Sequence, residues 1–144
     1  MSMPVAGDDF RTAHEGIRVQ TEALRRAARD IPHMAYADRA AARDAVVDFL
    51  RRDVEPHTRL DERLLYPEVA ERLGAPLATA SMAYDHLAIR QWITELEEAD
   101  PANPDHLQEL LYGLDALMRV HIWKENELYL PVVEASGWPV DVRP

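Results

Sequence analysis

An eleven-residue pattern occurs twice in this chain, beginning at His57 and again 64 positions later at His121. Both copies have a histidine, a carboxylate four residues on, a leucine at the eighth position and a proline at the eleventh. Residues four apart lie on one face of a helix, about 6 Å apart along its axis. An imidazole and a carboxylate presented together are ligands for first-row metal ions. The repeat therefore predicts two helices that each offer a pair of ligands to a site for two metal ions.

The amino-acid composition limits the possible fold classes and the possible binding partners. The chain has 144 residues, which suits one domain with a real core, and its few glycines and abundant Ala, Leu, Arg and Glu favour an all-helical protein. A net charge of −10 argues against nucleic acid and anionic membranes as partners. The lack of cysteine excludes disulfides, iron–sulfur clusters and thiol catalysis. No signal peptide or membrane-spanning apolar run is visible, so we expect a cytoplasmic protein.

Apolar residues at helical spacing predict four helices, at about 8–30, 38–73, 76–98 and 104–135. Pro56 lies inside the second helix, and we expect it to bend that helix just before His57. The connections are short, so neighbouring helices should run antiparallel. The fold class predicted for residues 1–135 is therefore an all-α, up-down-up-down antiparallel four-helix bundle. Residues 136–144, with Trp138, should form a C-terminal tail or a flap against the bundle.

Each predicted helix carries one histidine on its core-facing stripe. A single buried histidine is more often a hydrogen-bonded core residue than a ligand. Four of them, together with two correctly spaced carboxylates, are much harder to explain in that way. Two buried and unpaired carboxylates would also cost several kcal/mol unless a cation compensates them. The predicted metal ligands are His14, His57, Asp61, His86, His121 and Glu125.

The stretches Glu55 to Pro67, Asp85-His86 and His121 to Pro131 resemble the hemerythrin-like, or HHE cation-binding, domain. The resemblance extends over nearly the whole chain. It implies a four-helix bundle around a non-haem di-iron centre, with two iron ions bridged by carboxylates and by an oxo or hydroxo group. It assigns His14 and His57 to one iron, His86 and His121 to the other, and Asp61 and Glu125 to the bridges.

The chain departs from the family pattern at two places. Oxygen-carrying hemerythrins have a second histidine on the third helix, but the positions four either side of His86 are Met82 and Arg90. Water, oxide or another side chain must then complete the coordination of one iron. In the first motif, Asp61 stands where most relatives have glutamate, and the neighbouring Glu62 is a rival ligand. The acid precedes the proline by six residues in both copies, which favours Asp61.

The other candidate residues receive a structural interpretation. His33, in a loop, and His106, at the start of the fourth helix, are expected to be exposed to solvent. Tyr84 lies half a turn before His86 and could approach the centre, although a structural role is favoured. The sequence contains neither the Glu-x-x-His motif of ferritin-like proteins nor the His-Glu-x-x-His motif of zinc proteases. The aromatic residues expected in the core or at an interface are Tyr66, Trp92, Trp123 and Tyr129.

A di-iron centre of this kind leaves coordination positions open for a small ligand. An apolar sheath that includes Leu64, Ile89 and Leu117 would slow the entry of water and protons, which favours reversible binding over oxidation. We therefore expect a protein that binds oxygen or a related small ligand, for sensing, carriage or storage. The alternatives are an enzyme that consumes peroxide or handles nitric oxide, an iron buffer, and a helical interaction module. Iron, manganese and zinc share these ligand types, and no protein partner is indicated.

Overall fold

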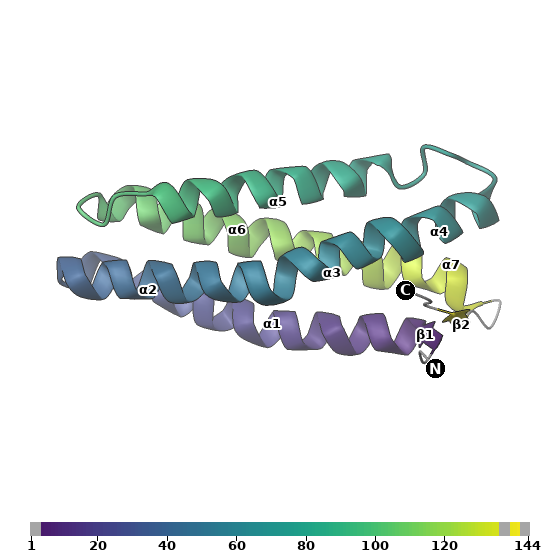
Figure 1. Ribbon diagram of the computed structural model, residues 1–144, viewed down its shortest axis with the longest axis horizontal. Coiled ribbons are helices and arrows are strands. Elements are labelled where there is room, and N and C mark those ends of the chain that lie inside the picture. Colours follow the sequence, from purple (N-terminus) through teal and green to yellow (C-terminus); the bar gives the residue numbers. More distant parts are fainter. Residues whose placement is uncertain (1–3, 136–138, 142–144) are drawn as a thin grey trace.

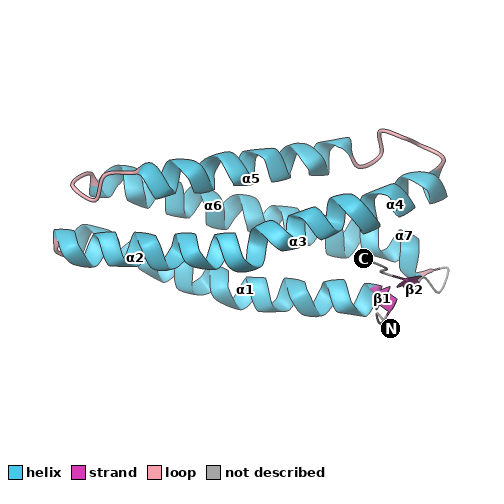
Figure 2. Ribbon diagram, in the orientation of Figure 1, coloured by secondary structure: helices cyan, strands magenta, loops and turns pink. Residues whose placement is uncertain are grey.

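The computed structural model describes residues 4–135 and 139–141, and these residues are almost wholly helical (Figure 2). Four helical rods run antiparallel in an up-down-up-down bundle (Figure 1), which confirms the predicted all-α fold. The first rod is α1 (Gly7–Asp30), and the third rod is α5 (Ala80–Glu98). The second rod contains α2 (Tyr36–Phe49), α3 (Glu55–Leu60) and α4 (Tyr66–Leu73). The fourth rod contains α6 (Pro104–Lys124) and α7 (Leu130–Glu134).

Local signals end the rods close to the predicted positions. Pro32 lies in the 3-10 turn Ile31–His33 that follows α1. Gly74 ends α4 in the left-handed conformation, with φ 60°, which glycine adopts without a Cβ clash. Asn103 caps α6, because its side-chain oxygen accepts a hydrogen bond from the backbone N–H of His106 at 3.2 Å. Helix α5 begins at Ala80, later than expected, because residues 76–79 form turns instead.

Three π-helical turns widen the second and fourth rods. They are Leu50–Val54, Asp61–Leu65 and Glu125–Tyr129, and each ends two residues before a proline, at Pro56, Pro67 and Pro131. Proline lacks an N–H, and its ring crowds the carbonyl four residues back, so an α-helical turn is disfavoured at this point. A π turn, which bonds to the fifth residue back, avoids that conflict. The sequence predicted a bend at Pro56, and the structure shows that a widened turn precedes this proline.

Two apolar clusters fill the interior of the bundle. The larger cluster joins α1, α2, α5 and α6 around fully buried side chains such as Ile93 and Leu114. The smaller cluster lies at the other end, around Phe10, Leu65 and Leu130. Burial of each such side chain contributes about 1.5–3 kcal/mol. On every rod the predicted ligands fall between the two clusters, so the apolar packing on both sides holds the polar residues in the middle of the bundle.

A short antiparallel sheet joins the two ends of the chain. Strand β1 (Pro4–Ala6) pairs with β2 (Pro139–Asp141), with Val5 opposite Val140. The sequence predicted no strand, and these segments meet because α1 begins where α7 ends (Figure 1). Trp138, expected in a tail or flap, lies outside the described residues. Within the described part of the chain, no helix has both the length and the apolar character needed to span a membrane.

Candidate metal centre

The six predicted ligands come together in the middle of the bundle. They form two groups, in each of which one ligand atom per residue lies within 4.8 Å of the others. The first group is His14, His57, Asp61 and Glu125, and the second group is Asp61, His86, His121 and Glu125. All are buried except His57, whose side chain is 10% exposed. The two carboxylates belong to both groups, as bridging ligands would.

The histidine Nε2 atoms point toward one another inside each group. The Nε2 atoms of His14 and His57 are 2.8 Å apart, and those of His86 and His121 are 2.9 Å apart. Glu125 spans both pairs, because its Oε2 lies 2.9 Å from His14 Nε2 and its Oε1 lies 2.7 Å from His121 Nε2. Four ring nitrogens and a shared carboxylate therefore converge on two neighbouring points.

Asp61 spans the same two groups from the opposite rod. Its Oδ1 lies 3.4 Å from His57 Nε2, and its Oδ2 lies 3.4 Å from His86 Nε2. Asp61 and Glu125 each stand at the start of a π turn, and these turns occupy matched positions in the two copies of the motif. The structure thus places Asp61 between the two groups.

Glu62, the rival of Asp61, faces outward. Its Oε1 accepts hydrogen bonds from His86 Nδ1 at 2.9 Å and from Arg90 Nη2 at 3.1 Å. Arg90 therefore supports the site from outside and does not enter it. Met82, on the other side of His86, is fully buried and belongs to the smaller apolar cluster. Neither residue takes the place of the histidine that the third helix lacks.

Three of the four histidines have their outer ring nitrogen held by a polar side chain. The pairs are His14 Nδ1 with Asn126 Oδ1 at 2.7 Å, His86 Nδ1 with Glu62 Oε1 at 2.9 Å, and His121 Nδ1 with Asp85 Oδ2 at 2.9 Å. An oxygen acceptor at this position puts a proton on Nδ1 and directs Nε2 toward the interior. Such outer partners are typical of metal-ligating histidines.

The site contains buried carboxylate oxygens that no other group in the described part of the chain compensates. Both oxygens of Asp61 are buried without a hydrogen-bond partner among the described residues. Burial, together with the charge of Glu125, raises the pKa of Asp61 well above its usual range. Burial and the nearby charge of His14 lower the pKa of His57 to about 4. Neutral imidazoles beside buried carboxylates are the donor set that divalent cations bind, so these residues fit a two-metal centre.

His121 and Glu125 form the shortest histidine–carboxylate contact among the six predicted ligands. Burial disfavours the charge on both side chains, but their contact at 2.7 Å outweighs burial. The pKa of Glu125 is therefore lowered, and the pKa of His121 is raised. A metal ion that binds His121 must displace the proton held between these residues, so metal binding should release protons.

Tyr66 is a residue of the centre that the sequence analysis assigned only to the core or an interface. It is buried, but its hydroxyl donates a hydrogen bond to Glu125 Oε1 at 2.5 Å. The same oxygen lies 3.0 Å from His86 Nε2 and 3.3 Å from His121 Nε2, beside the second group. The sequence did carry a signal, because both Tyr66 and its counterpart Leu130 directly precede the proline of their motif. At this position, one copy of the motif therefore has a polar residue and the other copy has an apolar residue.

The remaining candidates lie away from the centre. His33 is exposed, and the side chain of His106 is 43% exposed, as predicted. Tyr84 is 73% exposed and does not approach the metal site. Trp123, expected in the core or at an interface, is 66% exposed on the outer surface of α6. The prediction of a core position is therefore wrong for this residue.

A small cavity and an open pocket adjoin the centre, and a second open pocket lies beside Tyr66. The cavity measures about 10 Å³, roughly the space of one water molecule, and touches His57, Asp61 and His121. Its other walls are mostly apolar, and they are formed by Ile17, Val54, Thr58, Ile89, Met118 and Ile122. Of the residues expected in the apolar sheath, Ile89 lines the cavity. Leu64 packs against the smaller apolar cluster, and Leu117 packs against the larger one.

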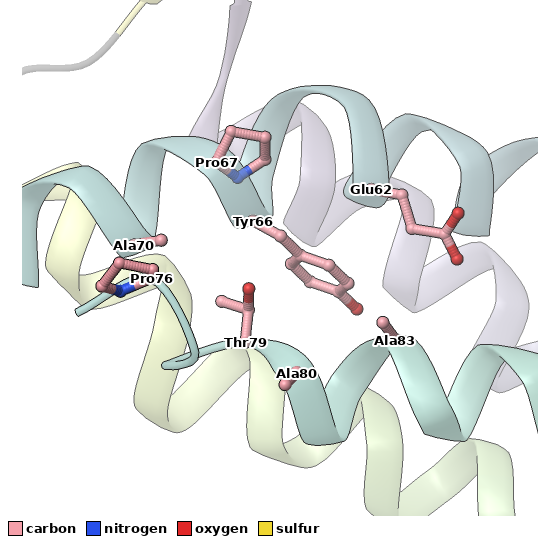
Figure 3. A pocket seen from close by; sticks show the side chains of 8 residues that line it. All are labelled: Glu62, Tyr66, Pro67, Ala70, Pro76, Thr79, Ala80 and Ala83. Atoms are coloured by element: carbon pink, nitrogen blue, oxygen red, sulfur yellow. The ribbon is translucent and has the colours of Figure 1, made fainter.

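Both open pockets have a volume of about 370 Å³. The first lies between α4 and α5, where the ring of Tyr66 points toward the small side chain of Ala83 and Glu62 stands nearby (Figure 3). The second lies between α1 and the second rod, and His57 forms part of its lining. The second pocket therefore brings solvent to His57, whereas the first brings it to Tyr66 and Glu62, which contact His86.

Comparison with known proteins identifies the family. No curated protein and no solved structure matches the chain. A protein-family model described as the hemerythrin HHE cation binding domain matches residues 5–133, a span that includes all six predicted ligands and Tyr66. The chain therefore belongs to the hemerythrin HHE cation-binding domain family.

Proposed function

We propose that this protein holds two non-haem iron ions and binds oxygen or a related small diatomic ligand beside them. The proposal is carried by two buried ligand groups that share Asp61 and Glu125 next to a small, mostly apolar cavity. Imidazole and carboxylate donors without thiolate suit iron in both common oxidation states. His14 and His57 would hold one ion, and His86 and His121 the other. Bound iron would supply the electrons for reversible ligand binding.

The size and lining of this cavity favour a small and uncharged ligand. Its volume of about 10 Å³ admits little more than one water-sized molecule without rearrangement. The lining is mostly apolar, with Ile17, Ile89 and Met118 among its residues, so an uncharged molecule enters it at a lower desolvation cost than an anion does. A neutral diatomic molecule loses little solvation in such a cavity. Sensing, carriage or storage of oxygen is consistent with this selection by size and polarity.

A peroxide-consuming enzyme is the second candidate, and Tyr66 favours it. Its ring lines an open pocket of about 370 Å³, while its hydroxyl contacts Glu125 and His86 (Figure 3). A phenol at this position could pass a proton between the pocket and the centre. Cleavage of the peroxide bond requires such proton transfer, whereas simple oxygen binding does not.

The two candidates are separated by metal analysis combined with absorbance spectra of the reduced protein before and after exposure to air and then to peroxide. Two irons per chain and a new near-ultraviolet band that reverses when oxygen is removed would support ligand binding. Two irons with no stable adduct but rapid loss of peroxide would favour the enzyme. Fewer than one metal ion per chain, in protein produced with ample iron, would refute the di-iron proposal.

Tyr66→Phe should leave the iron content unchanged and remove a visible absorption band from the ferric protein. The Tyr66 hydroxyl lies 3.0 Å from His86 Nε2, so as a phenolate it would supply the ligand that the third helix lacks. Burial and the charges of Glu125 and Asp61 raise the pKa of Tyr66, so only a bound cation would remove its proton. Phenolate bound to ferric iron absorbs visible light, and phenylalanine cannot replace it.

Tyr129→Phe is the matched control for this experiment. The Tyr129 hydroxyl donates a hydrogen bond to the carbonyl oxygen of Ala78 at 3.2 Å, away from the centre, so its loss should leave the spectrum unchanged. A visible spectrum that survives in Tyr66→Phe would show that Tyr66 is not a metal ligand.

A further inference from the structure

Two residues that support the lone histidines occupy matched positions in the repeat but differ in charge. Glu62 and Asn126 each directly follow the shared carboxylate of their motif. Glu62 Oε1 accepts a hydrogen bond from His86 Nδ1 at 2.9 Å, and Asn126 Oδ1 accepts one from His14 Nδ1 at 2.7 Å. Each residue therefore reaches across the bundle to the lone histidine of the other half of the chain. The geometry is the same on both sides, but a carboxylate stands on one side and a neutral amide on the other.

A second difference separates the paired histidines. Asp85 Oδ2 accepts hydrogen bonds from His121 Nδ1 at 2.9 Å and from Lys124 Nζ at 2.5 Å. The Nδ1 of His57, the counterpart of His121, has no polar partner within the part of the chain that the structure describes, and His57 borders an open pocket. Asp85 directly precedes His86, whereas Ala13 directly precedes His14 and lines that same pocket. The first group therefore lacks a carboxylate at this position too.

Cations stand near both groups, and each is paired with a carboxylate: Arg90 with Glu62, Lys124 with Asp85, and Arg11 with Glu134. These pairs leave a similar net charge on the two sides, so the difference lies in the group that accepts from histidine Nδ1–H. Arg90 and Lys124 bond the carboxylates of Glu62 and Asp85 on the second side. On the first side, Arg11 Nη2 donates a hydrogen bond to the backbone oxygen of Asn126 at 3.1 Å. Among the described residues, carboxylates that accept directly from histidine Nδ1–H groups of the centre stand only behind the second group.

We propose that the two metal positions differ in affinity, with a tight position at His86 and His121 and an exchangeable position at His14 and His57. This inference rests on the proposed two-metal centre. A carboxylate that accepts from Nδ1–H makes Nε2 a stronger electron donor to a metal ion than a neutral amide acceptor does. Outer partners of this kind change metal affinity by about 10–100-fold. Tyr66 adds a potential oxygen ligand to the second position only, because its counterpart Leu130 has none.

Titration of the metal-free protein with Co²⁺, followed by visible absorbance, tests this inference. We expect two binding steps whose dissociation constants differ by at least about tenfold. Glu62→Gln keeps the acceptor oxygen but removes the charge, so it should weaken the tight step about tenfold. Asn126→Asp adds a charge to the other side, so it should strengthen the weak step by a similar factor. Glu127→Gln, at an exposed carboxylate beside Asn126, should change neither step.

The outcomes separate this inference from the proposed function. Two Co²⁺ ions that bind with equal affinity, unchanged by Glu62→Gln and Asn126→Asp, would overturn the inference and leave the two-metal centre intact. A protein that binds neither Co²⁺ nor Fe²⁺ would instead refute the proposed function. Far-ultraviolet circular dichroism establishes that each variant is folded. Because the two substitutions act on different histidines, either one alone suffices if the other variant fails to fold.

Discussion

Glu125→Gln should reduce the metal content from two ions per chain to fewer than one. Glu125 places Oε2 2.9 Å from His14 Nε2 and Oε1 2.7 Å from His121 Nε2, so one carboxylate serves both positions. Glutamine has nearly the same size, but it carries no charge and presents an amide nitrogen in place of one oxygen. Loss of a shared anionic ligand should therefore weaken both sites by more than about 100-fold, beyond the usual effect of an outer partner.

Elemental analysis of the purified variant and Co²⁺ titration of its metal-free form would measure this loss. His57→Ala should remove about one metal equivalent, because His57 belongs only to the first group. His33→Ala and His106→Ala should retain both ions, since these residues lie outside the two groups. Two tightly held ions in Glu125→Gln would show that this carboxylate does not bridge the centre.

Asp61→Asn should stabilise the metal-free protein by about 1–3 kcal/mol and abolish its stabilisation by metal. Both Asp61 oxygens are buried without a hydrogen-bond partner among the described residues, and they share the site with Glu125. Asparagine does not ionise, so the folded state no longer has to bury a charge or take up a proton at this position. Its NH₂ group can donate to His57 Nε2 or His86 Nε2, each of which lies 3.4 Å from an Asp61 oxygen. The residue proposed to bind metal is therefore also a source of instability when no metal is bound.

The advantage of Asp61→Asn should grow as the pH rises. Burial and the charge of Glu125 raise the pKa of Asp61 in the folded protein, so the folded state holds a proton that the unfolded state has already lost. The contribution of Asp61 to the free energy of unfolding of the wild type therefore falls as the pH rises from about 3.9 toward this raised pKa. The asparagine side chain of the variant does not titrate and escapes this loss. The lowered pKa values of His57 and His86 act in both proteins and largely cancel in the difference.

Urea unfolding at several pH values, with and without Co²⁺, would test this prediction. Saturating metal should stabilise the wild type by about 4 kcal/mol at a thousandfold excess over the dissociation constant, and the variant by far less. Asp115→Asn is the matched control, because Asp115 is an equally buried aspartate whose Oδ2 pairs with Arg119 at 3.0 Å. That variant should be less stable than the wild type. A metal-free Asp61→Asn protein less stable than the wild type near neutral pH would contradict the prediction.

Periodicity along the helices allowed the bundle and the six clustered residues to be predicted. A helix presents every third or fourth residue on one face, so the spacing of His57 and Asp61 already determines their common direction. The prolines at matched positions of the two motifs also indicated a change in the helix. Proline cannot donate to an α-helical turn, and both Pro67 and Pro131 follow a π turn that begins at a carboxylate of the centre. Sequence alone could not tell a π turn from a bend, because that choice depends on packing along the whole rod.

Only the tertiary structure shows which residues form hydrogen bonds with the six clustered residues. Glu62 and Asn126 hold histidines on other rods, and Tyr66 reaches a glutamate 59 positions away. The pairing of β1 with β2 likewise depends on where two distant helices end. Spacing along one helix determines which residues share a face, and this chain repeats that spacing twice. Contacts between helices depend instead on their offset, their rotation and the choice of side-chain rotamers, which only the packed bundle determines.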